Sequence, residues 1–306
     1  MGEAMTDDDQ RLDRYLVSNG MAASRRVARD LIEAGMVRVN GSPSRKSELV
    51  HSGDRVELDS RPVAAALTAD PSIVLEILYV DPSVVVVNKP GMMPCHPMRP
   101  GETGTVMNGL AAAMPETAAV GVDPREGGLI HRLDNGTSGA LMIARNGDSF
   151  GLLRAAIRGG GIRRRYQALV SGRMEQATEI DVAISHDRRR SHRMLSRSGG
   201  RMSGVRPPRA ASTHAVPTRW FNGMTLVDVY PSTGLRHQIR VHLASIEHPI
   251  VGDELYGGEL SPAEPTRALR AGRFWLHLTE IEFESPAAGG VAVTAPLPDE
   301  LARLLN

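Results

Sequence analysis

The chain has 306 residues, of which 41% are hydrophobic and 23% charged, a balance typical of a folded protein rather than a disordered one. No apolar run approaches the roughly 18 residues of a membrane span, and the acidic start MGEAMTDDDQ lacks the apolar segment of a secretion signal. A single cysteine, Cys95, excludes an internal disulfide and a cysteine zinc cluster. We therefore expect a cytoplasmic protein that has no contact with membranes.

The formal net charge of +1 hides two regions of opposite charge. Residues 154–209 contain 14 arginines and four acidic residues, whereas residues 247–306 contain ten acidic residues and four arginines. A basic region beside an acidic one is typical of a protein that binds a polyanion on one face. The alternative is an arginine-rich surface that is only solvated. The distribution favours a nucleic-acid partner.

In chain order, residues 1–10 are predicted to be a disordered acidic tail and residues 11–60 a compact module. Residues 11–20 carry apolar side chains at helical spacing and end in glycine, and residues 24–35 follow the same pattern after a serine N-cap. An Asn40-Gly41 turn then follows a short strand. The module is thus a helix pair followed by short strands.

Three arginines, Arg25, Arg26 and Arg29, lie on the exposed side of the second predicted helix. A helix pair, an Asn-Gly turn and strands, with basic residues clustered early, resembles the S-four-type RNA-binding module named after a ribosomal protein. The resemblance implies that these three arginines contact RNA phosphates. The alternative for this segment is a small helical cap domain.

Residues 61–72 are rich in proline and alanine and are predicted to be a linker. In residues 73–306, strand-like runs dominate, and helical patterns interrupt them near residues 105–114, 148–158 and 236–246. Strands and helices without regular alternation favour an α+β domain around a mixed sheet over a doubly wound fold.

The segment GLIHRLDNGTSGALMIARN, residues 128–146, holds the most informative polar residues. Two strand-like runs flank a polar loop, so Asp134 is expected where a strand gives way to a loop. Rigid scaffolds often hold catalytic groups at such places. An aspartate that begins an Asn-Gly loop is more often a turn former, so Asp134 alone is a weak signal.

The same segment is similar to the H-R-L-D-x-x-T-S-G signature of the RluA-type RNA pseudouridine synthase family. Three further matches occur in the family's order: NKPG with a following HP (88–97), RRRYQALVSG (163–172), and STGLRHQIRVHLA with HPIVGDELYGG (232–258). The resemblance implies an enzyme that isomerises specific uridines in structured RNA, with ribosomal RNA favoured over transfer RNA. Residues 73–306 would form its mixed-sheet catalytic domain. Asn135 and Leu235 depart from the family's usual residues, but neither is assigned to the chemistry.

The reaction breaks the N1–C1′ bond of uridine, turns the uracil over and rejoins it through C5. No atom is lost and nothing is oxidised, so we expect no cofactor and no metal. One ionised carboxylate near the sugar is the minimal apparatus, and Asp134 is the candidate. Whether it attacks the sugar, removes a 2′ proton or stabilises a cationic sugar stays open. By resemblance, Arg240 keeps this carboxylate ionised, and Tyr166 packs on the uracil and helps to remove the C5 proton.

A target base in folded RNA must leave its stack to reach a buried aspartate. Arg132 and His131, just before Leu133-Asp134, are placed to occupy the vacated space, although His131 fits a structural role equally well. The three arginines before Tyr166 are expected to contact phosphates. The same is expected of Arg236, which lies one helical turn before Arg240 on a helix predicted to begin near residue 234. The substrate-binding residues expected outside the module are Lys89, at the floor of the pocket, with His131, Arg132, Arg165 and Arg236.

Two other classes of protein remain open. One is a non-catalytic RNA-binding or ribosome-assembly protein on the same fold, and the other is a glycosidic-bond hydrolase that uses Asp134. The combination of Asp134, Tyr166 and Arg240 favours the isomerase over the binding protein. A hydrolase usually needs two carboxylates, and the sequence places no second one near Asp134. We expect the protein to act as a monomer.

Overall fold

The computed structural model describes residues 10–22, 24–33, 35–45, 48–58, 67–99, 101–121, 123–187, 192–197, 207–257, 269 and 271–305. The chain divides into two compact units, residues 1–66 with 122–124 and residues 67–121 with 125–306. Of the expected acidic tail, only Gln10 lies within the described residues. None of the helices in these ranges is long and apolar enough to span a lipid bilayer.

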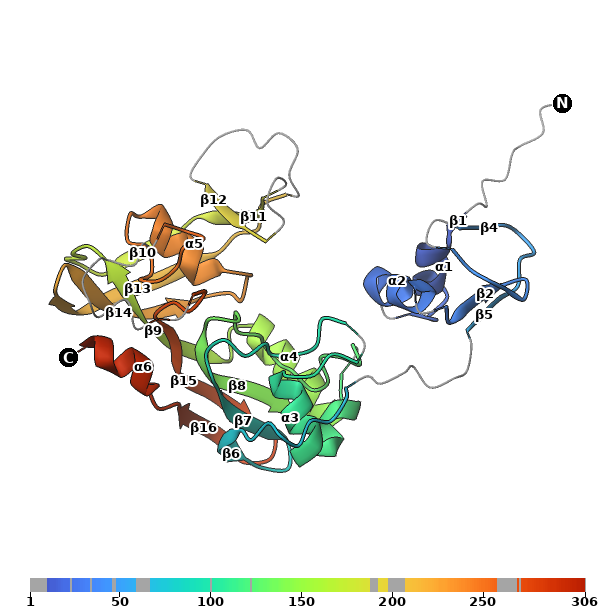
Figure 1. The fold of residues 1–306 in the computed structure, drawn as a ribbon, viewed down its shortest axis with the longest axis horizontal. Helices are drawn as coiled ribbons and strands as arrows, with labels where there is room; N and C mark the ends of the chain where they lie inside the picture. Colours follow the sequence, from blue (N-terminus) through green and yellow to red (C-terminus); the bar gives the residue numbers. More distant parts are fainter. Residues whose placement is uncertain are drawn as a thin grey trace. The chain divides into compact units, whose positions relative to one another are not determined.

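The N-terminal unit packs a helix pair against short strands (Figure 1). Its elements are β1 (Gln10–Arg11), α1 (Leu12–Ser18), α2 (Arg25–Glu33), β2 (Val37–Val39), β3 (Ser42–Pro43), β4 (Leu49–Val50) and β5 (Val56–Leu58). Strand β1 pairs with β4, and β2 lies between β3 and β5. Leu12, Leu16, Ala28 and Ile32 bury the apolar sides of both helices in one small core.

The turns of this unit follow the sequence pattern. Gly20 and Gly35, beyond the ends of the two helices, have φ of 69° and 68°, a conformation that glycine adopts without steric cost. Asn40 and Gly41, with φ of 52° and 79°, form the two-residue turn between β2 and β3. The expected Asn-Gly turn is confirmed.

The C-terminal unit is built on a nine-stranded mixed sheet with strand order β10-β13-β14-β9-β15-β8-β7-β6, with β16 also paired to β15. Strands β15 and β8 are parallel, and the other pairs in this sheet are antiparallel. Its strands are β6 (Glu76–Val80), β7 (Val84–Lys89), β8 (Ser138–Ala144), β9 (Arg163–Ser171), β10 (Thr178–Asp181), β13 (Ser212–Phe221), β14 (Met224–Pro231), β15 (Leu276–Ser285) and β16 (Gly289–Thr294). A separate pair joins β11 (Ala183–His186) to β12 (Met194–Arg197). The expected α+β class with a mixed sheet is confirmed.

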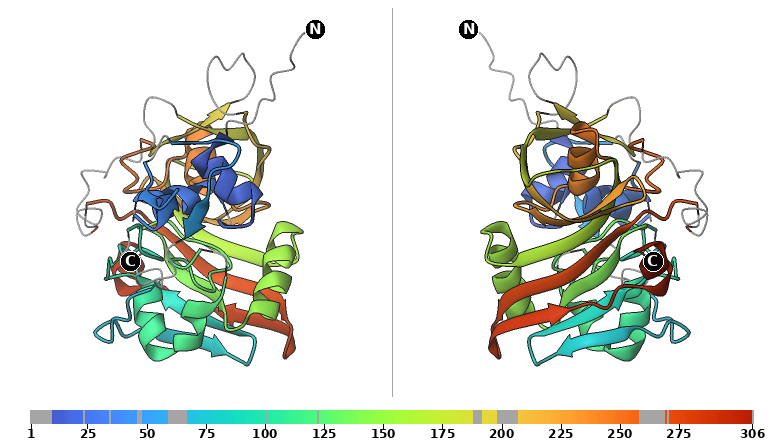
Figure 2. Two further views of the ribbon diagram at one scale, coloured as in Figure 1. Left: turned by 90° about the vertical axis from the view of Figure 1, so that its right-hand side faces the viewer. Right: turned by 90° about the vertical axis from the view of Figure 1, so that its left-hand side faces the viewer.

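Helices cover different parts of this sheet (Figure 1). The helical elements are α3 (Val106–Ala113), η1 (Pro115–Ala119), α4 (Gly147–Arg158), α5 (Gln238–Ser245), α6 (Asp299–Ala302) and η3 (Arg303–Leu305). Helices α3 and α4 lie at the β6–β7–β8 end, whereas α5 lies beside β12, β13 and β14, and both side views show this separation (Figure 2). Strands β7 and β8 are buried almost throughout, and the main core also includes residues of β9, β14 and β15.

Two expected elements differ in the structure. Residues 129–133 form no strand beyond a single bridge from Leu129 to Ile143. The Ile130 amide still donates to the Met142 carbonyl, but the Met142 amide donates to the His131 side chain, and the main chain of Leu133 bonds to the Cys95 side chain. The helix expected from residue 236 begins at Gln238, because His237 adopts the left-handed conformation with φ of 54°.

The linker expected over residues 61–72 is also different in part. Residues 61–66 lie outside the described residues, and the rest of the segment folds onto the C-terminal unit. The Asn108 side chain donates to the Thr68 carbonyl at 2.7 Å, and the Asp70 amide donates to the Asn108 carbonyl at 3.0 Å. Asn108 is fully buried at the start of α3, where its polar groups need such partners.

Candidate active site

Asp134 lies in the loop that leads into β8, and its surroundings fix the position of its main chain. The Thr137 amide donates to the Asp134 carbonyl at 3.0 Å, which closes a tight turn. One residue earlier, the Cys95 thiol contacts the Leu133 carbonyl at 3.3 Å and the Leu133 amide at 3.4 Å. Cys95 is buried, and this burial raises the pKa of its thiol. The cysteine therefore supports the loop as a neutral group.

Lys89 lies behind the loop that carries Asp134 and does not line the cleft, so the structure does not place it for the expected contact with substrate. Its side chain is fully buried, and Nζ donates to the carbonyls of Pro90 (2.8 Å), Met93 (2.7 Å) and Asn135 (3.2 Å). Burial lowers its pKa to about 8. Lys89 joins the end of β7 to the residue after Asp134, so its contribution is to the shape of the loop.

Arg273 holds the other side of the same loop. Its Nη1 donates to the carbonyl of Gly136, and Nη2 donates to the Ser138 hydroxyl at 2.9 Å. Gly136 packs so closely on Phe274 that a Cβ there would lie 2.5 Å from the aromatic ring. A Cβ at Gly91 would likewise collide with the Arg273 guanidinium. The two glycines thus allow the arginine to reach the loop main chain.

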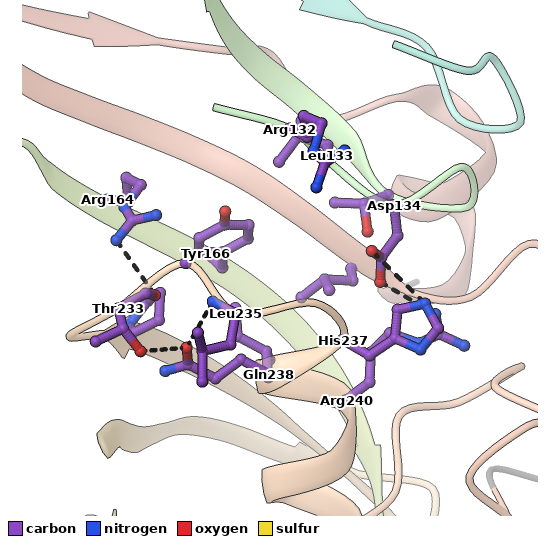
Figure 3. A pocket seen from close by; sticks show the side chains of 15 residues that line it. Arg132, Leu133, Asp134, Arg164, Tyr166, Thr233, Leu235, His237, Gln238 and Arg240 are labelled. Carbon is purple, nitrogen blue, oxygen red and sulfur yellow. Dashed lines mark hydrogen bonds and ion pairs between the residues drawn. The ribbon is translucent and has the colours of Figure 1, made fainter. Parts of the chain in front are cut away.

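Arg240 pairs with Asp134, as Figure 3 shows. Its Nη1 donates to Asp134 Oδ2 at 3.0 Å. Its remaining two nitrogens donate to Asp253, from Nε to Oδ2 at 2.6 Å and from Nη2 to Oδ1 at 2.8 Å. The side chain of Asp253 is 1% exposed and that of Asp134 is 24% exposed. Only Asp134 of this pair of carboxylates is therefore accessible from the cleft.

The environment of Arg240 keeps its guanidinium charged. Burial by itself would lower the pKa of Arg240, but the hydrogen bond with Asp253 and the charges of both aspartates outweigh burial and raise it. The guanidinium also lies over two aromatic rings, 4.3 Å from the centroid of Phe274 and 5.1 Å from that of Tyr256. Arg240 is thus a fixed cation beside Asp134.

His237 lies on the other side of the Asp134 carboxylate, with Nε2 at 3.9 Å from Oδ1. Burial lowers the pKa of His237 to about 4, although the Asp134 charge opposes this shift. The Tyr256 hydroxyl accepts from the Met194 amide at 2.8 Å, so its proton is available for His237 Nδ1 at 2.9 Å. The neutral ring therefore carries its proton on Nε2, facing Asp134.

Tyr166 projects from β9 into the same cleft and belongs to the core with Ala168 and Val170, which share its face of the strand. It is 7% exposed, and its hydroxyl makes no hydrogen bond within the described part of the chain. Burial raises the pKa of Tyr166 to about 12, because the phenolate would be poorly solvated. The phenol keeps its proton at neutral pH.

His131 and Arg132, two and one positions before Leu133-Asp134, differ in accessibility. His131 is buried and accepts from the Met142 amide through Nε2 at 3.2 Å, and burial lowers its pKa to about 3. This geometry corresponds to the structural alternative for His131 and not to substrate contact. Arg132 lines the cleft with a side chain that is 58% exposed and lies 3.5 Å from Glu126. Only Arg132 of the two can reach a bound molecule.

Arg165 is not a free cation, contrary to its expected phosphate contact. It donates from Nε and Nη2 to Glu280 Oε2 at 2.9 and 2.7 Å, and it lies 3.6 Å from Asp228. Strand β15 pairs with β9 in a register that puts Glu280 opposite Arg165. Arg236 is exposed, but it precedes α5 and so does not lie one helical turn before Arg240.

The arginines of the N-terminal unit surround one buried aspartate. Arg25 donates to Asp13 from Nη2 at 2.8 Å, and Arg29 Nε lies 3.9 Å from the same carboxylate. Burial would raise the pKa of Asp13, but hydrogen bonds from Arg25 and Arg11 outweigh burial and lower it. Both Arg25 and Arg29 remain about half exposed, at 48%. The side chain of Arg26 lies outside the described residues.

Four residues near Asp134 were not assigned a role from the sequence: Asp253, Tyr256, His237 and Arg273. Asp253 and Tyr256 lie in the quoted segment HPIVGDELYGG, and His237 directly precedes Gln238-Ile239-Arg240. The matched motifs therefore contained all three residues and could have pointed to them. Arg273 carried no signal in the sequence. No group of three or more His, Cys, Asp or Glu within the described ranges is placed to hold a metal ion.

Comparison with known protein families gives two matches. A model described as RNA pseudouridylate synthase matches residues 83–245, which include Asp134, Tyr166 and Arg240. A model of the S4 domain matches residues 10–56.

Relatives match over nearly the full chain. An uncharacterized RNA pseudouridine synthase of Mycobacterium bovis is 35% identical over 94% of this chain and 90% of its own length. Ribosomal large subunit pseudouridine synthase D of Xylella fastidiosa is 34% identical over 97% of this chain and 88% of its own length. Among solved structures, human RNA pseudouridylate synthase domain containing 1 superposes with a TM-score of 0.58 at 27% identity, over 74% of this chain and 84% of that one.

Proposed function

The chain belongs to the RNA pseudouridylate synthase family, and from this premise we propose that Asp134 is its catalytic group and that it isomerises specific uridines in structured RNA. Ribosomal RNA is the favoured substrate, because several relatives are named ribosomal large subunit pseudouridine synthase D. The reaction conserves every atom and requires no oxidant, so the proposal includes no cofactor.

The observation that carries the proposal is the arrangement of Asp253, Arg240 and Asp134. Asp253 occupies two nitrogens of Arg240, and the third nitrogen holds one oxygen of Asp134. Oδ1 of Asp134 accepts no hydrogen bond within the described part of the chain, and it faces the cleft beside His237. An ionised, oriented carboxylate with one unoccupied oxygen suits attack on a sugar, removal of a 2′ proton or stabilisation of a cationic sugar equally.

Tyr166 supplies the surface for the uracil in this proposal. Its ring lines the cleft with Asp134, and its phenol retains a proton at neutral pH because burial raises its pKa to about 12. We therefore assign Tyr166 to packing against the base, and not to accepting the C5 proton in the free protein. Asp253 does not serve as a second acid or base, because Arg240 occupies both of its oxygens. This supports an isomerase over a hydrolase.

RNA contacts outside the chemistry follow from exposed cations. Arg132 at the cleft is the candidate to fill the space left by the flipped base, since His131 is buried. Arg29 and the free face of Arg25 are candidates for phosphate contacts by the N-terminal unit, residues 11–60. One chain supplies Asp134, Tyr166 and Arg240, so the proposal includes a monomer, acting in the cytoplasm.

The test compares the intact protein with Asp134→Asn. Carbodiimide-reactive pseudouridines are mapped in ribosomal and transfer RNA from cells that contain the protein, lack it or carry the variant. We expect one or more sites to disappear in the last two strains, while the purified variant binds RNA within a few fold of the original affinity, since the amide preserves the shape of the carboxylate. Sites that persist in the variant strain would contradict the role of Asp134.

A further inference from the structure

Three consecutive arginines on β9 differ sharply in their partners. Side chains alternate between the two faces of a strand, so Arg163 and Arg165 share one face and Arg164 lies on the other. Arg163 lies 3.5 Å from Glu282, and Arg165 lies 2.7 Å from Glu280. Arg165 is thus held by two hydrogen bonds to Glu280, whereas Arg163 makes only a solvent-exposed contact with Glu282. Arg164 points to the side of the sheet that holds Tyr166.

Arg164 is a buried cation without a carboxylate partner in the described part of the chain. It is 7% exposed, and its one hydrogen bond runs from Nη2 to the Thr233 carbonyl at 3.3 Å (Figure 3). Its Nε has no partner. The two other buried arginines at this site each have one, Asp253 for Arg240 and Glu300 for Arg273. A buried charge is costly unless it is paired, and the described part of the chain supplies no counter-ion for Arg164.

The loop between β14 and α5 lies against the end of Arg164. Gly234 follows Thr233 in this loop and is exposed, and a Cβ on Gly234 would lie 3.2 Å from Arg164 Nη1. The absence of that side chain leaves Nη1 open to a ligand. Arg164 and Gly234 line the same cleft as Asp134 and Tyr166, so a group bound there belongs to the molecule that occupies the cleft.

We propose that Arg164, beside the glycine of the Thr233–Gly234 loop, forms an anion subsite that binds one backbone phosphate next to the uridine being isomerised. This inference rests on the proposed function, and it adds which phosphate of the RNA the cleft recognises. RNA carries one negative charge per linkage, and a guanidinium forms strong charge-assisted hydrogen bonds to phosphate oxygens. Of the three arginines of β9, Arg164 is the one that lines the cleft with Tyr166, and it acts by positioning the target nucleotide over Tyr166.

The test uses the full chain and a synthetic stem–loop that carries a uridine identified by the mapping experiment. Two further stem–loops have an uncharged methylphosphonate at the linkage on the 5′ or the 3′ side of that uridine. Affinities are measured in the Asp134→Asn background, so that no turnover occurs. For one of the two linkages we expect removal of the charge to weaken binding by about tenfold or more, the loss typical of a hydrogen bond to a charged group.

Two variants and a control separate a phosphate subsite from a structural cation. Arg164→Gln should bind the charged and uncharged stem–loops equally, at the weaker affinity. Gly234→Ala keeps the arginine but crowds Nη1, and it should lower the discrimination without unfolding the protein, since residue 234 does not have the left-handed φ that favours glycine. Arg163→Gln, with the same change in charge on the same strand, should discriminate as before.

The subsite is refuted if neither uncharged linkage weakens binding, or if Arg164→Gln still discriminates between the stem–loops. Such a result would leave the proposed function standing, because the mapped uridine would already have been shown. If mapping finds no uridine that depends on this protein, the proposed function fails first and the subsite fails with it. The two failures are therefore distinguishable.

Discussion

Asp253 holds Arg240 side-on through two hydrogen bonds of 2.6 and 2.8 Å, and this leaves one guanidinium nitrogen to hold Asp134 at 3.0 Å. Asp253 is buried and closed to solvent, whereas Asp134 faces the cleft. The buried aspartate thereby fixes the orientation of the arginine, and the arginine fixes that of the accessible aspartate. Arg240 therefore links a buried carboxylate with a structural role, Asp253, to the carboxylate proposed for the chemistry, Asp134.

Asp253→Asn tests this bridge without touching the cleft. Asparagine keeps the shape but removes the charge, and Arg240 can then rotate away from its position beside Asp134. We expect kcat for pseudouridine formation to fall by roughly 10²-fold, the effect of a displacement of about 1 Å on a reacting group, while KM changes little. Single-turnover conversion of a mapped RNA measures this. Glu280→Gln, which frees Arg165, is the control, and equal kcat in both variants would argue against the bridge.

Arg240→Met separates the two roles of the arginine. The variant leaves Asp253 buried without a cation, so we expect the free energy of unfolding to fall by about 3–5 kcal/mol, with severe loss of turnover. Adding Asp253→Asn to this variant removes the buried charge and should restore part of the stability but none of the activity. Urea unfolding and turnover are measured together. Recovery of activity in the double variant would mean that Arg240 acts only in the fold.

Buried neutral histidines should make the fold sensitive to acid. His277 Nδ1 accepts from the Ser138 hydroxyl at 2.9 Å, its Nε2 donates to the Ala295 carbonyl at 3.2 Å, and burial lowers its pKa from 6.5 to about 4. Above pH 6.5 the ring is neutral in both the folded and the unfolded chain. Between pH 6.5 and pH 4 only the unfolded chain binds the proton, so stability falls as the pH falls through this window.

For His277 the loss amounts to on the order of 3 kcal/mol by pH 4. We expect His277→Gln to flatten the decline in the free energy of unfolding between pH 6.5 and pH 4, as measured by urea titration at several pH values. His131 and His237 also have lowered pKa values, so part of the decline should remain. The control is His214→Gln, at a partly exposed histidine beside Glu179. Parallel curves for the original protein and His277→Gln would contradict the prediction.

Arg29→Gln and Arg25→Gln should affect the N-terminal unit differently. Arg29 makes the longer contact to Asp13, so its substitution should mainly remove a phosphate contact and lower the log–log salt slope of RNA binding by about 0.7–0.9. Arg25 makes the short contact, so its loss should destabilise this unit by about 1–3 kcal/mol. Thermal unfolding and filter binding at several salt concentrations distinguish them. Neither variant should change kcat, and Arg14→Gln, at an exposed arginine of α1, is the control.

Local signals in the sequence were enough for several elements. Helix ends at Gly20 and Gly35, and the turn at Asn40-Gly41, depend on backbone conformations that neighbouring residues alone select. The ordered motifs likewise named Asp134, Tyr166 and Arg240, which one cleft brings together. The mixed sheet followed from strand-like runs that do not alternate regularly with helices.

Charge partners were decided by the tertiary structure alone. The basic middle of the chain and its acidic end suggested a free basic face, but β9 and β15 pair side by side, and Arg165 and Arg163 there meet Glu280 and Glu282. The burial of Lys89 and His131 is likewise invisible in the sequence, because both stand within motifs and His131 directly precedes Arg132, which does reach the cleft.

By itself, then, the sequence determined the helix stops, the Asn-Gly turn and the residues of the motifs, because each depends on a few neighbouring positions. Only the tertiary structure decided which cations remain unpaired. Arg165 and Glu280 are separated by 115 positions, and Arg240 and Asp253 by 13, yet each pair is in contact. A charge keeps or loses its availability according to what packs against it in space, and that depends on strand register and burial, which no local pattern encodes.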